Sequence, residues 1–303
     1  MSKFFLILIV ACTLMSANAQ SIIVLGTAQD GGYPHIGCQK ECRLAWENPL
    51  LKQHVVSLAI MDSLARKWWL VEATPDFKEQ LELFRSLTDN YFDYLPAGIL
   101  LTHAHMGHYT GLIHLGREAL GASDVPVYAL PRLVEYLKSN GPWSQLVKLS
   151  NIKLQTIDEN TDVAISEKVS VNAFIVPHRD EFSETAGLTF NVFGKRAMFI
   201  PDIDKWSKWD KSIVEKVKSV DIAFLDATFF ADGELPNRSI NEVPHPFVSE
   251  TMALFEEEKD DLKSKIHFIH FNHTNPILWD EPIRQKVRAS GFQIAKQGMT
   301  YFN

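Results

Sequence analysis

The sequence is short of positive charge, and it lacks any long apolar run after its first twenty residues. The chain has 30 lysine and arginine residues against 37 aspartate and glutamate residues, which gives a formal net charge of −7. Proteins that bind nucleic acids usually carry a basic face, so this balance argues against a nucleic-acid partner. No later segment is long and apolar enough to span a bilayer, and no proline- or serine-rich linker divides the chain. These absences favour one globular domain over residues 20–303 that acts on a small molecule.

Cysteine is also scarce, since the chain holds only Cys12, Cys38 and Cys42. Cys38 and Cys42 lie four positions apart, and in an oxidising compartment they could form a disulfide. They would also suit a structural metal site together with His35, although two cysteines alone do not make a zinc site. Free thiols are the third alternative, and the sequence leaves all three open.

The first 19 residues have the three parts of a secretory signal peptide. Lys3 supplies a positive start, residues 4–14 are apolar, and an Ala-Asn-Ala cleavage site ends at Ala19. We therefore expect an exported protein, periplasmic or secreted, whose mature chain begins near Gln20. The residues before Cys12 also resemble a lipoprotein box, which leaves lipid anchoring at Cys12 as a second route.

Apolar patterning predicts strands and helices in alternation along the mature chain. Strands are expected at residues 21–26, 55–61, 67–72, 97–101, 125–129, 151–156, 169–176, 186–193, 196–200, 222–225 and 266–271. Helices are expected at residues 77–87, 111–120, 130–139 and 247–257. Sheets covered by helices, in an α/β sandwich, fit this alternation.

A cluster of histidines follows one of the predicted strands. The segment Thr-His-Ala-His-Met-Gly-His covers residues 102–108 and contains three histidines. At a strand end, His103 and His105 point the same way because alternate side chains share a face. His108 reaches an adjacent point once the chain turns into a helix. Neutral imidazole binds zinc, iron or manganese, so the segment predicts a metal site.

Four later segments place a histidine or an aspartate where a strand meets a loop. His178 and Asp202 each follow a proline at the end of an apolar run, and His270 lies on the last predicted strand. His273 follows in the segment Asn-His-Thr-Asn-Pro, residues 272–276. Sites in α/β proteins gather at strand ends, where loops converge, so we expect these side chains to lie together.

This order of residues resembles the metallo-β-lactamase superfamily, whose signature is His-x-His-x-Asp-His followed by a His, an Asp and a final His. The resemblance implies a four-layer αββα sandwich over residues 20–303. It also implies a metal centre with a first ion on His103, His105 and His178. A second ion would be held by His108 and His270, with Asp202 bridging the two.

Five segments are similar to the pyrroloquinoline quinone biosynthesis protein B branch of this superfamily. They cover residues 25–32, 71–76, 176–181, 225–229 and 270–276, so the similarity extends over nearly the whole mature chain. The branch is related to phosphodiesterases and tRNA-processing nucleases, in which a segment like Asp-Ala-Thr-Phe and a later histidine help to protonate the leaving group. Here that segment is residues 226–229 and the histidine is His245. Glu72 is expected to support one of the metal-binding histidines.

One residue departs from the signature, because Gly107 stands where the superfamily has an aspartate. That carboxylate binds the second metal ion and orients the attacking water, and glycine can do neither. Three outcomes follow: the site holds a single ion, the gap is filled by Asp30, Asp204 or water, or hydrolysis is lost. We expect the first outcome, with one ion favoured over two, because the first site keeps all three of its histidines.

Together these residues predict a metal-dependent hydrolase that acts on an ester, amide or phosphodiester bond. A three-histidine site leaves a position for water and lowers the pKa of that water toward neutrality. Asp202 would orient or deprotonate the water, and His245 or His273 would protonate the leaving group. Zinc is the expected ion, while iron or manganese would also suit these ligands.

Two other functions compete with hydrolysis. An iron-dependent oxidative enzyme related to quinone cofactor biosynthesis would use the same ligands, although a signal peptide argues against a place in that cytoplasmic pathway. A non-catalytic binding protein on the same fold is the second; Gly107 favours it, whereas the retained histidines and Asp202 oppose it. Nothing in the sequence predicts a particular substrate or oligomeric state.

Overall fold

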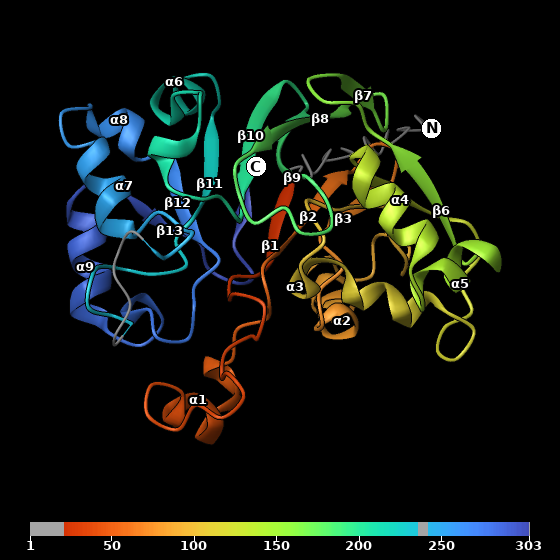
Figure 1. The fold of residues 1–303 in the computed structure, drawn as a ribbon, viewed down its shortest axis with the longest axis horizontal. Coiled ribbons are helices and arrows are strands. Elements are labelled where there is room, and N and C mark those ends of the chain that lie inside the picture. The colour runs from red at the N-terminus through yellow and green to blue at the C-terminus, as the bar shows by residue number, and fades with distance from the viewer. Residues whose placement is uncertain (1–20, 236–241, 303) are drawn as a thin grey trace, which may run out of the picture.

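The computed structural model describes residues 21–235 and 242–302, which form two seven-stranded β-sheets with helices on their outer sides (Figure 1). The strand order is β14-β1-β2-β3-β4-β5-β6 in the first sheet and β13-β12-β11-β10-β9-β8-β7 in the second. The predicted signal peptide, residues 1–19 with Cys12, lies outside the described residues.

The first sheet is built almost entirely from the first half of the chain. Its strands are β1 (Ile22–Gly26), β2 (Ser57–Asp62), β3 (Lys67–Val71), β4 (Gly98–Leu100), β5 (Val125–Ala129), β6 (Ile152–Thr156) and β14 (Thr300–Tyr301). Strands β3 to β6 run parallel, so their carboxyl ends lie at one edge of the sheet. The short C-terminal strand β14 pairs antiparallel with β1.

The second sheet is built from the second half of the chain. Its strands are β7 (Asp162–Ala164), β8 (Val169–Val176), β9 (Thr185–Val192), β10 (Lys195–Ile200), β11 (Ile222–Asp226), β12 (Ile266–Ile269) and β13 (Gln293–Ile294). Strands β10 to β13 are parallel. Since β8 and β10 are each antiparallel to β9, β8 runs in the same direction as β10. The carboxyl ends of β8, β10, β11 and β12 therefore meet at one edge.

Helices cover the two outer faces, which confirms the predicted four-layer αββα sandwich (Figure 1). The first sheet is covered by α2 (Phe77–Leu87), α4 (Pro131–Ser139) and α5 (Trp143–Lys148). The second sheet is covered by α6 (Ile213–Lys218), α7 (Val248–Leu254), α8 (Asp260–Lys263) and α9 (Glu281–Ala289). The short helix α1 (Arg43–Glu47) lies apart from both sheets, on a segment that projects below them in Figure 1.

Strand β3 illustrates why these sequences form internal strands. Trp68 and Leu70 pack in the outer core under the helices, and Trp69 and Val71 pack in the core between the two sheets. The Trp68 ring stacks on Phe84 of α2, with 3.9 Å between the ring centroids. Successive side chains of a strand point to opposite faces, and a strand buried on both faces is apolar throughout. Both sheets need such strands because each is covered on both sides.

The helix expected at residues 111–120 is wrong in type and extent. The chain forms a short α-helix, α3 (Met106–Tyr109), then a 3₁₀ helix, η2 (Thr110–Leu115). At Gly111 a Cβ atom would lie 2.2 Å from the carbonyl oxygen of Thr74, so the chain passes close to another segment there. The other 3₁₀ helices include η1 (Pro49–Leu51), η3 (Trp206–Lys208) and η5 (Pro276–Leu278). Over the described ranges, no helix has the length and apolar character to cross a membrane.

Candidate metal centre

The strand ends of the two sheets bring the predicted ligands to one place. His103 follows β4 of the first sheet, whereas His178, Asp202 and His270 follow β8, β10 and β12 of the second. Ligand atoms of His103, His105 and His178 all lie within 4.8 Å of one another, and so do those of Asp30, His108 and His270. The structure thus forms two ligand groups at the meeting edges of the sheets.

The first group consists of His103, His105 and His178. The Nε2 atom of His103 lies 2.9 Å from Nδ1 of His105, and the His178 ring lies 5.0 Å from the His105 ring. Burial lowers the pKa of His178 to about 4, and burial followed by the nearby His108 lowers the pKa of His103 well below its usual value. Both rings are therefore neutral at pH 7, which is the form that binds a metal ion.

Asp202 lies between the two groups. Its Oδ1 atom is 3.6 Å from Nε2 of His178, while its Oδ2 atom is 3.0 Å from Nε2 of His108 and 3.3 Å from Nε2 of His270. Burial of the carboxyl raises its pKa, but the surrounding histidines, His270 and His108 foremost, outweigh burial and hold it well below the usual value. One ionised carboxylate therefore presents an oxygen to each group.

Glu72 supports the histidines from behind, as the sequence predicted. Its side chain is fully buried and accepts a hydrogen bond of 2.5 Å from the Thr102 hydroxyl. Its Oε1 atom also lies 3.4 Å from Nδ1 of His108. Burial lowers the pKa of His108, but Glu72 and the contacts with Asp202 and Asp30 raise it well above its usual value. Glu72 therefore places a buried carboxylate beside the His108 ring.

Two residues at this edge have an unusual backbone. Glu72 has φ +69° and His270 has φ +68°, in the left-handed region that residues other than glycine seldom adopt. Such a conformation costs about 1–3 kcal/mol per residue, and it persists where surrounding contacts fix it. Both residues turn the chain sharply after a strand, which directs their side chains into the site.

His245 belongs to a second buried network beside the ligand groups. Its Nδ1 atom lies 2.8 Å from Oδ2 of Asp226 and 3.7 Å from Oδ1 of Asp202. The Thr228 hydroxyl donates to Oδ1 of Asp226 at 2.7 Å and lies 2.9 Å from Nδ1 of His270. Burial lowers the pKa of His245, but the charge and hydrogen bond of Asp226 overcome this effect and raise it. An imidazole whose charged form is favoured by Asp226 therefore lies beside the cluster.

His273 lies elsewhere. Its ring stacks on His35, with 4.2 Å between the ring centroids. Within the described residues, no hydrogen bond, ion pair or ring contact joins it to the histidines of the two ligand groups or to His245. Cys38 and Cys42 are free thiols, so the disulfide alternative is not formed. The backbone NH of His35 donates to the Cys42 sulfur at 3.3 Å. A metal site on the two cysteines and His35 stays a prediction.

The atoms that converge at the two ligand groups fit a divalent ion. Within the described ranges, buried atoms without a hydrogen-bond partner include both ring nitrogens of His108 and His178, Nε2 of His270, Oδ1 of Asp30 and Oδ2 of Asp202. A buried polar atom left without a partner costs about 1–3 kcal/mol. Metal coordination would satisfy several of these atoms at once, and histidine with carboxylate is a common ligand set for zinc.

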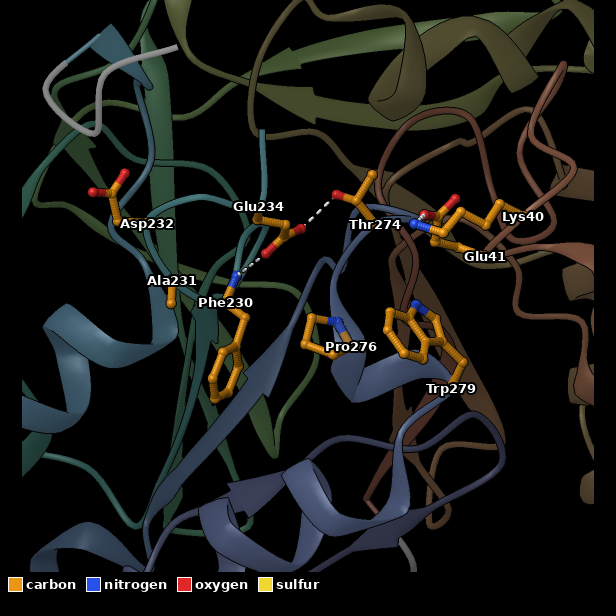
Figure 2. A pocket seen from close by; sticks show the side chains of 9 residues that line it. All are labelled: Lys40, Glu41, Phe230, Ala231, Asp232, Glu234, Thr274, Pro276 and Trp279. Carbon is orange, nitrogen blue, oxygen red and sulfur yellow. Dashed lines mark hydrogen bonds and ion pairs between the residues drawn. The ribbon is translucent and has the colours of Figure 1, made fainter. Parts of the chain in front are cut away.

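A pocket of about 340 Å³ is lined by residues that include Phe230, Glu234, Thr274 and Trp279 (Figure 2). Phe230 follows Thr228 by two residues in the chain. Glu234 accepts a hydrogen bond from the backbone NH of Phe230 at 2.6 Å and another from the Thr274 hydroxyl. Burial raises the pKa of Glu234. Its carboxyl thereby links the loop after β11 to the loop after β12, which carry Thr228 and His270.

Some residues of the site had only a weak signal in the sequence. The sequence offers Asp30 only as one of three ways to fill the gap at Gly107, yet its carboxylate lies 3.2 Å from Nε2 of His108. The sequence marked Thr228 only as part of the segment at residues 226–229, yet its hydroxyl contacts Asp226 and the rings of His245 and His270. The signal that pointed to Asp30 was its place after the first strand, within a Gly-Thr-Ala-Gln-Asp-Gly-Gly segment.

The model of the "Beta-lactamase superfamily domain" family matches residues 67–271. Coenzyme PQQ synthesis protein B of Methylorubrum populi is 25% identical over 302 residues, which cover 92% of this chain and 98% of the relative. The corresponding protein of Rhizobium meliloti is 26% identical, with 92% of this chain and 96% of the relative covered.

Two solved structures share the fold. The crystal structure of Zn(2+)-bound PqqB from Methylobacterium extorquens has a TM-score of 0.76 and 22% identity, covering 92% of this chain and 99% of that one. A diphosphatase from the PhnP family has a TM-score of 0.66 and 23% identity, covering 93% of this chain and 96% of that one. At these identities the likeness concerns the fold alone.

Proposed function

Because the chain belongs to the beta-lactamase superfamily, we propose that it is a metal-dependent hydrolase, with a phosphodiester as the favoured substrate among phosphodiesters, esters and amides. One observation carries the proposal. Buried ligand atoms without hydrogen-bond partners converge on Asp202, and a histidine paired with a buried aspartate, His245, lies directly beside them. Hydrolysis of a phosphodiester needs both an activated water and a proton for the leaving group.

The first ligand group would hold the metal ion through His103, His105 and His178. A zinc ion bound there would supply Lewis-acid activation of water and of a phosphoryl oxygen. Asp202 is ionised and faces the same point, so it would accept a hydrogen bond from the attacking water and orient it. Zinc is the proposed ion because three imidazoles and a carboxylate suit it, and the PqqB structure was solved with zinc.

His245 would protonate the leaving oxygen. Its Nδ1 atom is directed to Asp226, so Nε2 is the ring nitrogen available to a substrate. Asp226 favours the charged form of the ring, and Thr228 fixes the orientation of Asp226. A charged imidazole suits an alkoxide leaving group, which is too basic to depart without a proton. The ring of His273 stacks on His35 instead, so we assign the proton transfer to His245.

The test compares two phosphodiesters that differ in the need for a proton donor. We expect His245→Gln to lose about 10²- to 10⁴-fold in kcat/KM on a dinucleotide, whose leaving group is an alkoxide. On bis(4-nitrophenyl) phosphate the loss should be much smaller, because nitrophenolate departs without a proton. His114→Gln, with its ring on Phe77, serves as the control and should change neither rate.

Equal losses on both substrates would assign His245 a structural role. If the zinc-loaded wild-type protein hydrolyses neither phosphodiester, nor simple esters or amides, the proposal of a hydrolase fails.

An iron-dependent oxidation is the second candidate, favoured by the similarity to coenzyme PQQ synthesis protein B along 92% of the chain. Elemental analysis of protein purified without chelators or added metal separates the two. Iron in the purified protein, with oxygen consumption in the presence of a quinone precursor, would put the oxidative reaction first. Zinc without oxygen consumption would support hydrolysis, and a protein without metal after reconstitution would favour a binding protein.

We also propose that residues 20–303 form one exported metallo-β-lactamase-like domain. This proposal rests on the Lys3, apolar and Ala-Asn-Ala pattern of residues 1–19, which lie outside the described part of the chain. Intact-mass analysis of the protein from a periplasmic fraction would test it. A chain that starts near Gln20 agrees with signal cleavage, a lipidated chain starting at Cys12 agrees with the anchored route, and retained Met1 contradicts both.

A further inference from the structure

The side-chain space at Gly107 is already filled by Asp30. A Cβ atom placed on Gly107 would lie 2.0 Å from Oδ1 of Asp30, 2.8 Å from its Cγ and 2.7 Å from its Cα. Contacts under 3 Å are too short for any side chain, so only glycine fits here unless Asp30 moves. The carboxylate of Asp30 thus occupies the volume into which a side chain at position 107 would project.

The Asp30 carboxylate faces the second ligand group. Its Oδ1 atom lies 3.2 Å from Nε2 of His108, is buried, and has no hydrogen-bond partner within residues 21–235 and 242–302. Nε2 of His108 and Nε2 of His270 are likewise buried and without partners there. One atom from each of these three residues lies within 4.8 Å of the other two. Three unpartnered ligand atoms thus point at one position.

The loop that carries Asp30 is fixed to the segment after β12 that carries His270. Ala28 forms a parallel bridge with Phe271, and the backbone NH of Gln29 donates to the Phe271 carbonyl at 2.8 Å. The Asn272 side chain donates to the Gln29 side chain as well. The two residues before Asp30 are therefore bonded to the residue after His270, and these backbone contacts fix the position of Asp30 relative to His270. A metal ligand needs such fixed positioning.

Together these contacts point to a relocated carboxylate. We infer that Asp30 replaces the missing aspartate of the superfamily signature, and that the chain binds a second divalent ion through Asp30, His108 and His270. Asp202 lies between the two groups, with Oδ1 near His178 and Oδ2 near His108, so its carboxylate would be shared by the two ions. The inference rests on the proposed metal centre, and it replaces the expectation of a single ion, which assumed that Gly107 left the second position without its own carboxylate.

The test is metal stoichiometry. The purified chain is reconstituted with excess Zn(II), dialysed and analysed by mass spectrometry of the elements. We expect two ions per chain for the wild type and one for Asp30→Asn, which keeps the shape of the side chain but removes its charge. Asp204→Asn is the matched control and should keep two, because the Asp204 carboxylate pairs with Lys208 at 2.7 Å instead of facing the cluster.

A spectroscopic measurement gives an independent result. Loaded with Mn(II), the wild type should give the electron paramagnetic resonance spectrum of a coupled pair, and Asp30→Asn that of an isolated ion. Gly107→Ala should also bind one ion, because its methyl group displaces the Asp30 carboxylate; this second variant serves if Asp30→Asn fails to fold by circular dichroism.

The outcomes separate the inference from the proposed function. One ion in the wild type, or two in Asp30→Asn, overturns the role of Asp30 and leaves a mononuclear hydrolase in place. No ion in the wild type overturns both.

Discussion

The imidazole of His245 and the carboxylate of Asp226 form a buried pair, with Nδ1 of the ring 2.8 Å from Oδ2 of the aspartate. Asp226 is the last residue of β11, and it also accepts hydrogen bonds from the backbone NH and hydroxyl of Thr228. His245 approaches it from the loop before α7. A strand therefore fixes the carboxylate of the pair, and a loop brings the histidine to it. The role of the pair in proton transfer can be tested by substituting Asp226 and leaving His245 in place.

Asp226→Asn should lower the pKa of His245, because the carboxylate that favours the charged ring is lost. A proton donor is lost as the pH rises through its pKa, so the alkaline limb of the pH profile of kcat/KM should move to lower pH. Asp221→Asn is the control. Asp221 directly precedes β11, and its carboxylate accepts a hydrogen bond from the backbone NH of Arg196. This variant should leave the alkaline limb in place. An unmoved limb in Asp226→Asn would mean that another group donates the proton.

His103→Ala and His178→Ala should each remove the ion of the first ligand group, because a zinc site with two histidines binds far more weakly than one with three. Elemental analysis after dialysis measures the loss. His114→Ala is the control, since its ring lies on Phe77 outside the cluster. Unchanged metal content in both ligand variants would show that the assignment of this group is mistaken.

Glu72→Ala should affect both stability and metal binding. The Thr102 hydroxyl would lose its 2.5 Å acceptor and Nδ1 of His108 its nearest carboxylate, so we expect about 3 kcal/mol less stability to urea. Chelator competition should report about 10- to 100-fold weaker metal affinity, since the ligand loses its support. Asp62→Ala is the matched control, a buried carboxylate of the same sheet that accepts from Ser166 at 2.6 Å. It should reduce stability alone.

His267 on β12 should make the fold sensitive to mild acid. Burial lowers its pKa to about 4 in the folded chain, against 6.5 for an exposed histidine. Between these values the unfolded chain binds a proton that the folded chain excludes, so stability is full above pH 6.5 and falls as the pH drops toward 4. His267→Phe keeps a ring between Phe224 and Tyr301 and removes this dependence, which amounts to roughly 2 kcal/mol from pH 7 to pH 5.

Urea unfolding at both pH values, with chelator present, measures the difference for wild type and variant. Parallel losses in the two proteins would mean that His267 is charged in the fold or that other groups dominate.

The sequence predicted the helices and strands whose own residues show a clear apolar period. The helix at Phe77–Leu87 and the strands at Val125–Ala129 and Val169–Val176 match the predicted bounds, because each has a clear apolar period with turn residues at its ends. Helix α9 (Glu281–Ala289) was missed, although Asp280 caps it, because Val287 is its one fully buried residue. Strand β14 exists only through its pairing with β1 near the other end of the chain, which no local pattern encodes.

The candidate site divides in the same way. Histidines directly after apolar runs could be identified from the sequence as metal ligands, because the end of a strand fixes where their side chains lie. The proximity of Asp30 to Gly107 could not, because it depends on how the loop after β1 meets the segment after β4. His245 and His273 were equivalent in the sequence, and the fold separates them, placing one beside Asp226 and the other beside His35.

The ligand groups draw on both sheets, and this has a consequence for the stability of the fold. The segment with His103, His105 and His108 belongs to the first sheet, and His178, Asp202 and His270 belong to the second. Neither half of the chain carries a full ligand set, so an ion can be captured only after the sheets have docked. An ion that binds only the folded state stabilises that state by mass action. Metal supply would therefore hold the two halves of the chain together, and chelation would lower the free energy of unfolding.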